Sequence, residues 1–301
     1  MASSFGASIP SSTALATFNQ NGETKEPVLG THDGVATKVK TSTFPNWGVS
    51  LAFLCSMRDG HEMKQSMLSL VRPDLDKDKL RAMPIEEIRK LAEELRVHSD
   101  LDGDIEFGNK NKNISGKYEN KNISREAWVQ KLMMPPRTTT QVNVCIIKPR
   151  TKKLGGSYAT TVLCGKNDSI TGLPYARQCP TDFVSHAWRC DFAELVNALE
   201  EEHTNRILQL PYKQAVQERS VTRYYWNDIF VKDQNTSDKK PDGYFFNAFR
   251  TAVQTIGRTV LVLEQLRGSV ALTRAWCIWE IFCTAEKNID LVVTMPTQLH
   301  T

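Results

Sequence analysis

Residues 259–263 read Thr-Val-Leu-Val-Leu, an apolar run without the polar alternation of a half-exposed strand. Such a run is typical of a strand buried on both faces, as in parallel sheets that are covered by helices. The residues before it, 244–256, are expected to form a helix, and Gly257 suits its C-terminal cap. After it, residues 274–286 are expected to be helical and residues 289–294 to form another strand. This alternation predicts an α/β fold.

The same alternation extends toward the N-terminus. Residues 182–188 and 224–231 are expected to be strands, and residues 192–201 between them are expected to form an amphipathic helix. Strands separated by helices at this spacing predict a parallel, doubly wound, flavodoxin-like sheet. Its core is expected to contain Phe183, Val184, Val260, Val262, Leu291 and Val292.

Three segments of this region lie in an order that carries a family resemblance. Residues 183–188, Phe-Val-Ser-His-Ala-Trp, combine a strand with a small polar turn, and residues 226–230, Trp-Asn-Asp-Ile-Phe, fall in the second strand. Residues 274–280 read Arg-Ala-Trp-Cys-Ile-Trp-Glu. Together they resemble the Toll/interleukin-1 receptor (TIR) family, and in particular a divergent TIR-like group found in protists. The resemblance covers about residues 179–295 and implies a TIR-like domain over residues 179–301.

The resemblance implies two functions of different classes. The first is intracellular signalling, in which the TIR-like domain associates with other TIR-like or adaptor proteins, including copies of itself. The second is an NAD glycohydrolase, because Glu280 matches the carboxylate that contacts a ribose hydroxyl of NAD in TIR enzymes and assists the loss of nicotinamide. A carboxylate suits this chemistry, since cleavage of the N-glycosidic bond develops a cation that a nearby anion stabilises.

The binding residues for NAD are expected at the end of the first strand, where doubly wound sheets bind their ligands. These candidates are Ser185, His186, Trp188 and Arg189. Trp188 could stack on a ring of the ligand and Arg189 could meet a phosphate. The alternative is a structural role for these residues. The aromatic residues of the helix at residues 274–286 then belong to the core, and Glu280 is a solvated residue or a partner of Arg274. A TIR domain also has a fifth strand and a final helix, whereas this chain ends at Thr301, so the last units are degenerate or the domain is truncated.

The N-terminal half divides into three expected regions. Residues 1–44 are small, polar and without hydrophobic periodicity, which predicts a disordered tail. Residues 45–136 are expected to be helical, with a helix at about residues 45–57 and a clear amphipathic helix that starts at Pro84. Residues 137–178 are expected to be a β-rich linker region.

A candidate calcium site lies in the helical region. Asp100, Asp102 and Asp104 alternate as in the first part of an EF-hand loop, and alternating carboxylates suit calcium. The register lacks both the glycine after the third aspartate and a glutamate in the last position. A degenerate, structural helix–loop–helix is therefore the alternative to a calcium-binding regulator.

Composition argues against several classes of protein. The chain has 38 Lys and Arg against 34 Asp and Glu, and this mild excess does not suggest a nucleic-acid surface. Seven scattered cysteines contain no Cys-x-x-Cys pair, which indicates a reducing compartment rather than a zinc site or a disulfide framework. No apolar run is long enough to span a membrane and no basic segment opens a signal peptide, so a cytoplasmic location is expected.

Overall fold

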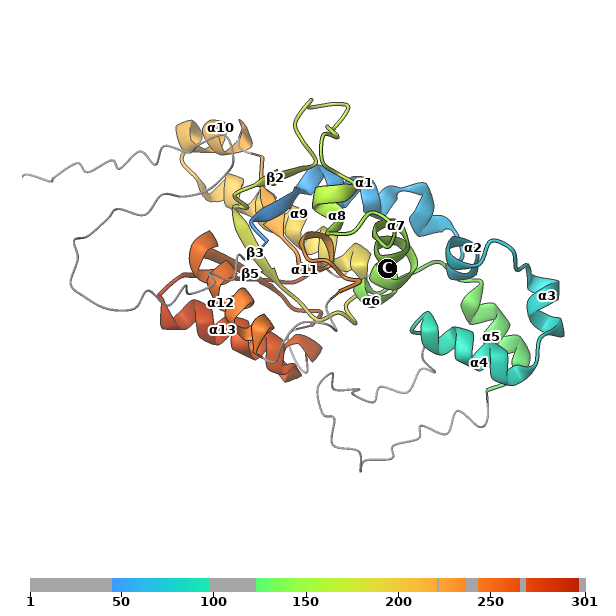
Figure 1. The fold of residues 1–301 in the computed structure, drawn as a ribbon. Helices are drawn as coiled ribbons and strands as arrows, with labels where there is room; N and C mark the ends of the chain where they lie inside the picture. Colours follow the sequence, from blue (N-terminus) through green and yellow to red (C-terminus); the bar gives the residue numbers. More distant parts are fainter. Residues whose placement is uncertain (1–44, 98–122, 221, 237–242, 266–268, 298–301) are drawn as a thin grey trace, which may run out of the picture. The chain divides into compact units, whose positions relative to one another are not determined.

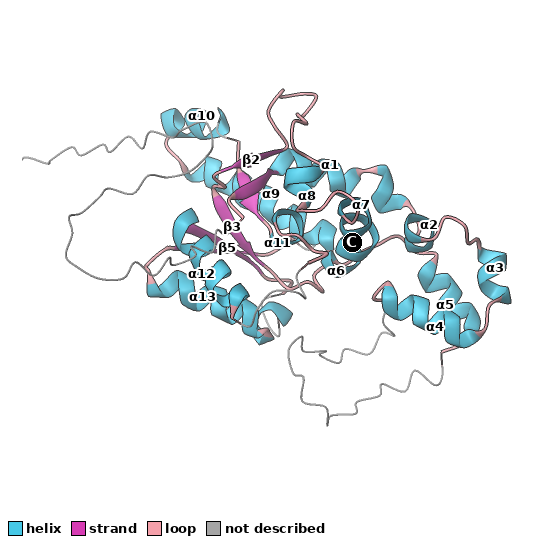
Figure 2. Ribbon diagram, viewed as in Figure 1, coloured by secondary structure: helices cyan, strands magenta, loops and turns pink. Residues whose placement is uncertain are grey.

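The computed structural model describes residues 45–97, 123–220, 222–236, 243–265 and 269–297. Within them, six strands form one mixed sheet with helices on both of its faces (Figure 2). The α/β class is therefore confirmed. None of the helices in the described part of the chain is both long and apolar enough to cross a bilayer. The predicted disordered tail, residues 1–44, lies outside the described residues.

The sheet has four parallel strands, and two further strands join them through antiparallel pairings. Its order is β2 (Ala176–Gln178), β1 (Trp47–Ser50), β4 (Tyr224–Trp226), β3 (Asp182–Ser185), β5 (Arg258–Val262) and β6 (Asp290–Thr294). The last four strands in this order run parallel, whereas β1 is antiparallel to both β2 and β4. The parallel sheet predicted for residues 182–294 is thus confirmed, and it continues into strands from the N-terminal half.

Two pairs of helices cover the sheet (Figure 1). Helix α9 (Phe192–Gln209) contacts α1 (Leu51–Asp59), β5 and β6. Helices α12 (Tyr244–Ile256) and α13 (Ala275–Glu286) contact each other, and α12 also contacts β3 and β5. All five residues of β5 are buried between these layers. This is the environment that the apolar run at 259–263 predicts.

The ends of these helices follow from particular residues. Asp191 caps α9, since its side chain accepts hydrogen bonds from the backbone N–H groups of Ala193 and Glu194 at 2.9 and 3.3 Å. Gly257 ends α12 with a φ of 77°, a left-handed conformation that glycine adopts without steric cost. The predicted bounds and cap of α12 are therefore confirmed.

The core prediction holds for four of its six residues. Phe183, Val184, Val260 and Val262 are buried. The prediction is wrong for Leu291, which is 38% exposed, and Val292 is only half-buried. The physical reason is that β6 is an edge strand of the described sheet.

The prediction of a β-rich linker over residues 137–178 is wrong. Its helical elements are α6 (Thr139–Val142), the π-helix η2 (Asn143–Ile147), α7 (Lys148–Thr151) and α8 (Tyr158–Thr161). Val142, Cys145 and Ile146 are buried, and this spacing of three and four residues belongs to a helix. Burial of that face outweighs the strand preference of β-branched residues.

The region over residues 45–136 is helical in large part, as predicted, but it begins with a strand. The expected helix at residues 45–57 is replaced by β1 followed by α1, and Ser50 marks the change by accepting the N–H of Phe53 at 3.1 Å. Helices follow at η1 (His61–Lys64), α2 (Met67–Val71), α3 (Lys77–Ala82), α4 (Ile85–Glu94) and α5 (Arg125–Leu132). Because β1 and β2 join the central sheet, the sheet includes segments from both sides of the predicted boundary at residue 179.

The second expected strand, residues 224–231, divides into two elements. Strand β4 ends at Trp226, and Asn227 then caps the short helix α11 (Asp228–Val231) by accepting the N–H of Ile229 at 3.3 Å. Two further elements complete the described fold, α10 (Tyr212–Ser220) and the 3₁₀ helix η4 (Val270–Thr273). The break at Asn227 turns Asp228 away from the strand ladder.

A buried ion cluster joins the strands at the amino end of the parallel sheet. Arg258 of β5 pairs with Asp182 of β3, with Glu202 of α9 at 2.5 Å and with Asp290 of β6 at 3.1 Å. Asp182 is fully buried and also pairs with Arg223 at 3.2 Å. These contacts fix the strands relative to α9 at the end of the sheet opposite the candidate site.

Candidate functional site

The centre of the candidate site is a hydrogen bond between β3 and α13. Ser185 is the last residue of β3, and its Oγ donates to Oε2 of Glu280 at 2.5 Å. Glu280 is only 6% exposed. The structure thus brings together two of the predicted site residues, 95 positions apart in the chain.

Glu280 faces the sheet because of its place on α13. One turn later on the same face, Thr284 donates its hydroxyl to the carbonyl of Glu280 at 2.8 Å, and its Oγ1 lies 2.9 Å from Oγ1 of Thr259 in β5. Cys277 and Cys283 are buried on either side. The alternative in which Glu280 is a solvated residue is therefore wrong.

The buried position changes the acidity of this carboxyl. Burial raises the pKa of Glu280 to about 8, and the charge of Asp228 adds to the rise. Donation from Ser185 and the positive charges of Lys232 and Arg274 oppose it. At pH 7 the group is mostly the neutral acid. In this conformation it is a buried acid with a hydroxyl donor and not an exposed anion.

The other residues of the predicted NAD site are anchored to the fold. His186 is buried, and burial lowers the pKa of its imidazole, which favours the neutral ring. The indole N–H of Trp188 donates to Oδ2 of Asp228 at 3.0 Å, and the carbonyl of Trp188 accepts from the backbone N–H of Thr140 at 2.8 Å. Arg189 is half-buried beside it in the chain. Trp188 therefore joins α6 and α11 in this conformation.

The structure adds charged residues that sequence reasoning missed. Asp228 and Lys232 follow β4 and lie close enough to Glu280 to influence its pKa. The ammonium of Lys232 lies 4.0 and 4.6 Å from the ring centres of Phe245 and Phe249, and burial lowers its pKa. A usable signal existed for Lys232, which follows the expected second strand, because the carboxyl ends of adjacent parallel strands meet at one edge of the sheet.

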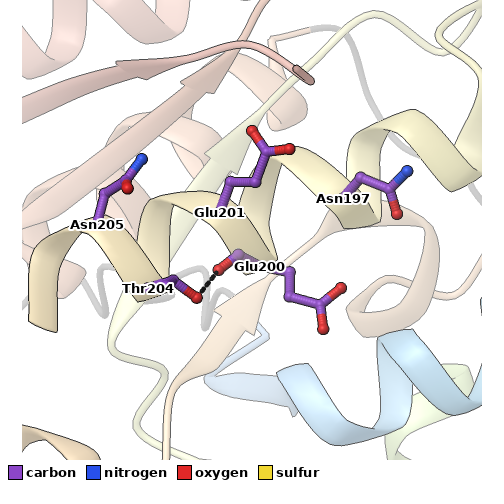
Figure 3. Close-up of a pocket in the computed structure, with 5 residues that line it drawn as sticks. All are labelled: Asn197, Glu200, Glu201, Thr204 and Asn205. Carbon is purple, nitrogen blue, oxygen red and sulfur yellow. Dashed lines mark hydrogen bonds between the residues drawn. The ribbon is translucent and has the colours of Figure 1, made fainter. Parts of the chain in front are cut away.

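A separate depression lies on the outer face of α9 (Figure 3). Its lining consists of Asn197, Glu200, Glu201, Thr204 and Asn205. The acidic groups are already paired, Glu200 with Arg58 at 2.7 Å and Glu201 with the hydroxyl of Thr297 at 2.7 Å. Both carboxylates of this depression thus already have hydrogen-bond partners within the chain.

The calcium prediction concerns residues that the structure does not describe, since Asp100, Asp102 and Asp104 fall within residues 98–122. Helices α4 and α5, which flank this segment, pack against each other. They end at Glu94 and begin at Arg125, much farther apart than the 12-residue loop of an EF-hand. Among the described residues, no group of three His, Cys, Asp or Glu side chains could hold a metal ion.

No family model matches the chain, and no curated protein or solved structure matches it either.

Proposed function

We propose that this protein is a cytosolic signalling protein that works through association of a TIR-like domain. The four parallel strands have the order β4-β3-β5-β6, the second, first, third and fourth in the chain, which is the order of a flavodoxin-like sheet. The TIR resemblance of two segments supports this identification. Residues 183–188 contain most of β3, and residues 274–280 contact it through the hydrogen bond between Ser185 and Glu280. The seven cysteines are all free, which agrees with a reducing compartment.

The observation that carries the proposal is an aromatic surface on α12 and α13. Phe246 contacts Trp276 and Trp279 with ring centres 4.6 and 5.3 Å apart, and Trp279 stacks on Phe282 at 5.4 Å. Phe246, Phe282 and the neighbouring Ile278 are 46%, 51% and 51% exposed. A contiguous exposed aromatic surface of this kind is typical of protein interfaces.

A second element supports association. Strand β6 is an edge of the described sheet, and Leu291 and Val293 on it are 38% and 53% exposed. An edge strand with exposed apolar side chains offers unpaired backbone groups to another chain. The proposed partners are other TIR-like or adaptor proteins, and the simplest of them to test is a second copy of this chain.

Sedimentation velocity over a concentration series tests the proposal. We expect the protein to self-associate and the substitution Phe282→Lys to weaken association by tenfold or more, since it places a charge in an apolar interface. The matched control is Leu208→Lys on α9, where an apolar residue that is 69% exposed, against 51% for Phe282, lies outside the aromatic surface. A protein that stays monomeric throughout, or a Phe282→Lys variant that associates like the control, would contradict the proposal.

A second candidate function is NAD glycohydrolase activity with Glu280 as the catalytic carboxylate. It is favoured by the position of the Ser185–Glu280 pair at the carboxyl end of β3, next to β5, where the strand order reverses. In the reaction the bond between ribose and nicotinamide breaks, nicotinamide leaves with the electron pair, and water adds to the ribose carbon. Because Glu280 is buried and mostly neutral at pH 7, it has to become accessible and ionised before it can stabilise the cation.

This candidate predicts nicotinamide release from NAD by concentrated or clustered protein, with a rate that rises toward about pH 8 as the carboxyl ionises. Glu280→Gln should abolish the release, because the amide keeps the shape but carries no charge. Glu286→Gln on the same helix is the control, since Glu286 pairs with Arg250 and points away from the site. Full activity of Glu280→Gln, or no release above a blank without protein, would exclude Glu280 from catalysis.

A further inference from the structure

One segment of the chain carries a high net positive charge. Residues 148–177 contain six basic residues and a single acidic one, Asp168, and so carry +5, whereas the whole chain carries +4. The rest of the chain therefore sums to −1. The basic residues are Lys148, Arg150, Lys152, Lys153, Lys166 and Arg177.

Within this segment, the loop between α8 and β2 has a defined structure of its own, and Figure 1 shows it reaching beyond both elements. Oδ1 of Asp168 accepts the backbone N–H groups of Ile170 and Thr171 at 3.2 and 2.7 Å, and the hydroxyl of Thr171 at 2.8 Å. The N–H of Asp168 in turn donates to the carbonyl of Leu173 at 2.8 Å. The single acidic residue of the segment is therefore used to shape the loop.

This loop presents aliphatic side chains between basic ones. Ile170 at its tip is 92% exposed and Leu173 is 40% exposed. Lys166 and Arg177 flank the base of the loop, where the carbonyl of Lys166 accepts the N–H of Tyr175 at 2.9 Å. The loop's hydrogen bonds belong to a conformation in which Ile170 is exposed, so its burial in this conformation requires another molecule.

A second exposed apolar residue accompanies the other basic residues. Lys152 and Lys153 are exposed and precede Leu154, which is 58% exposed. They precede α8 in the chain, whereas the loop follows it. Helix α8 has four residues and is thus roughly 6 Å long. Arg150 is paired with Glu62, whereas neither lysine forms an ion pair with a described residue.

We propose that residues 148–177 form a docking surface for an anionic lipid membrane, with Ile170 inserted among the acyl chains and Lys152, Lys153 and Lys166 at the headgroups. Aliphatic tips surrounded by lysines suit this partner, because apolar insertion and attraction to anionic lipid act together at a membrane surface. A single-stranded nucleic acid would instead need aromatic side chains on which its bases stack, and the exposed side chains here are aliphatic. This docking is peripheral and independent of the proposed association through α12 and α13.

Cosedimentation of the full chain with lipid vesicles tests the proposal. We expect binding to vesicles of phosphatidylcholine with phosphatidylserine, no binding to phosphatidylcholine alone, and weaker binding at higher salt. The double substitution Lys152→Ala/Lys153→Ala should lower the partition constant about 30-fold, from the known gain per basic residue at an anionic surface. Ile170→Asn should lower it roughly tenfold through loss of apolar insertion. Leu208→Asn, an exposed apolar residue on α9, should have no effect.

Three results would overturn the proposal: no binding to anionic vesicles, equal binding to neutral ones, or an unchanged partition constant for Ile170→Asn. Binding of a short RNA at the same salt, without vesicle binding, would assign the basic segment to nucleic acid instead. Because Ile170 and both lysines are exposed, their replacement should leave the fold intact, which circular dichroism checks. In an Ile170→Trp variant, a blue shift of the added emission with anionic vesicles only would report insertion of the loop tip directly.

Discussion

The substitution Glu280→Gln should change how the stability of this protein depends on pH. Burial beside Asp228 raises the pKa of Glu280 from its ordinary value of 4.5 to about 8. The folded state therefore holds this proton more tightly than the unfolded state does, and the free energy of unfolding falls as the pH rises from about 4.5 to about 8. At about 1.4 kcal/mol per pH unit, the loss from this one group amounts to at most about 5 kcal/mol.

Glutamine has no charge to lose, and its carbonyl oxygen can still accept the hydroxyl of Ser185. The difference in unfolding free energy between Glu280→Gln and the wild type should therefore rise in favour of the variant as the pH increases, by up to about 5 kcal/mol between pH 4.5 and pH 8. The glutamine side chain of the variant also buries an amide N–H that the carboxyl lacks. The cost of this burial shifts the difference in unfolding free energy by a constant, because the amide does not titrate. The measurement is urea denaturation at several pH values, with Glu286→Gln on the same helix as the control. If the difference stays flat with pH, the carboxyl of Glu280 is ionised in the folded protein and the reasoning is wrong.

Four further substitutions test the fold by urea denaturation. Asp182→Asn should cost about 3–5 kcal/mol, because it leaves Arg258 buried with one fewer counter-charge; a loss below 1 kcal/mol would mean that the cluster is solvated. Gly257→Ala should cost about 1 kcal/mol, since alanine adopts a φ of 77° only with strain, and no loss would contradict the left-handed cap. Val142→Ala should cost about 2 kcal/mol and Val144→Ala less than half of that, because only Val142 is fully buried; equal losses would favour a strand.

The sequence predicted the elements whose local and tertiary preferences agree. Residues 259–263 are apolar throughout and lie between helical layers, and α12 ends at Gly257, the residue with the freest backbone. The β-structure predicted for residues 141–147 was wrong because their β-branched side chains favour a strand, whereas their burial follows helical spacing. Strand β1 was missed because a run of seven apolar and small residues looks the same in a strand and in a helix, and its partner β4 lies far along the chain.

The candidate site divides in the same way. Ser185 and Glu280 were predicted from the family resemblance, and the structure joins them by a hydrogen bond. Asp228 was missed because the strand was expected to run through residue 231, which places its side chain along a ladder, and Lys232 lies just after that expected end. Only the cap at Asn227, where a side-chain oxygen replaces the next strand pairing, turns this segment toward Glu280.

The pairing of β1 with β4 also sets an order of events during synthesis. Val49 lies opposite Ala176 of β2 and Tyr225 of β4, so both partners of β1 exist only after about 175 further residues have been translated. At the usual rate of elongation this takes roughly 10 to 35 s, which is long compared with the folding of most small domains. During that time β1 and the apolar helix that follows it are available to chaperones or to the wrong neighbours. Co-translational handling, more than the stability of the finished sheet, is thus expected to limit the yield of this protein.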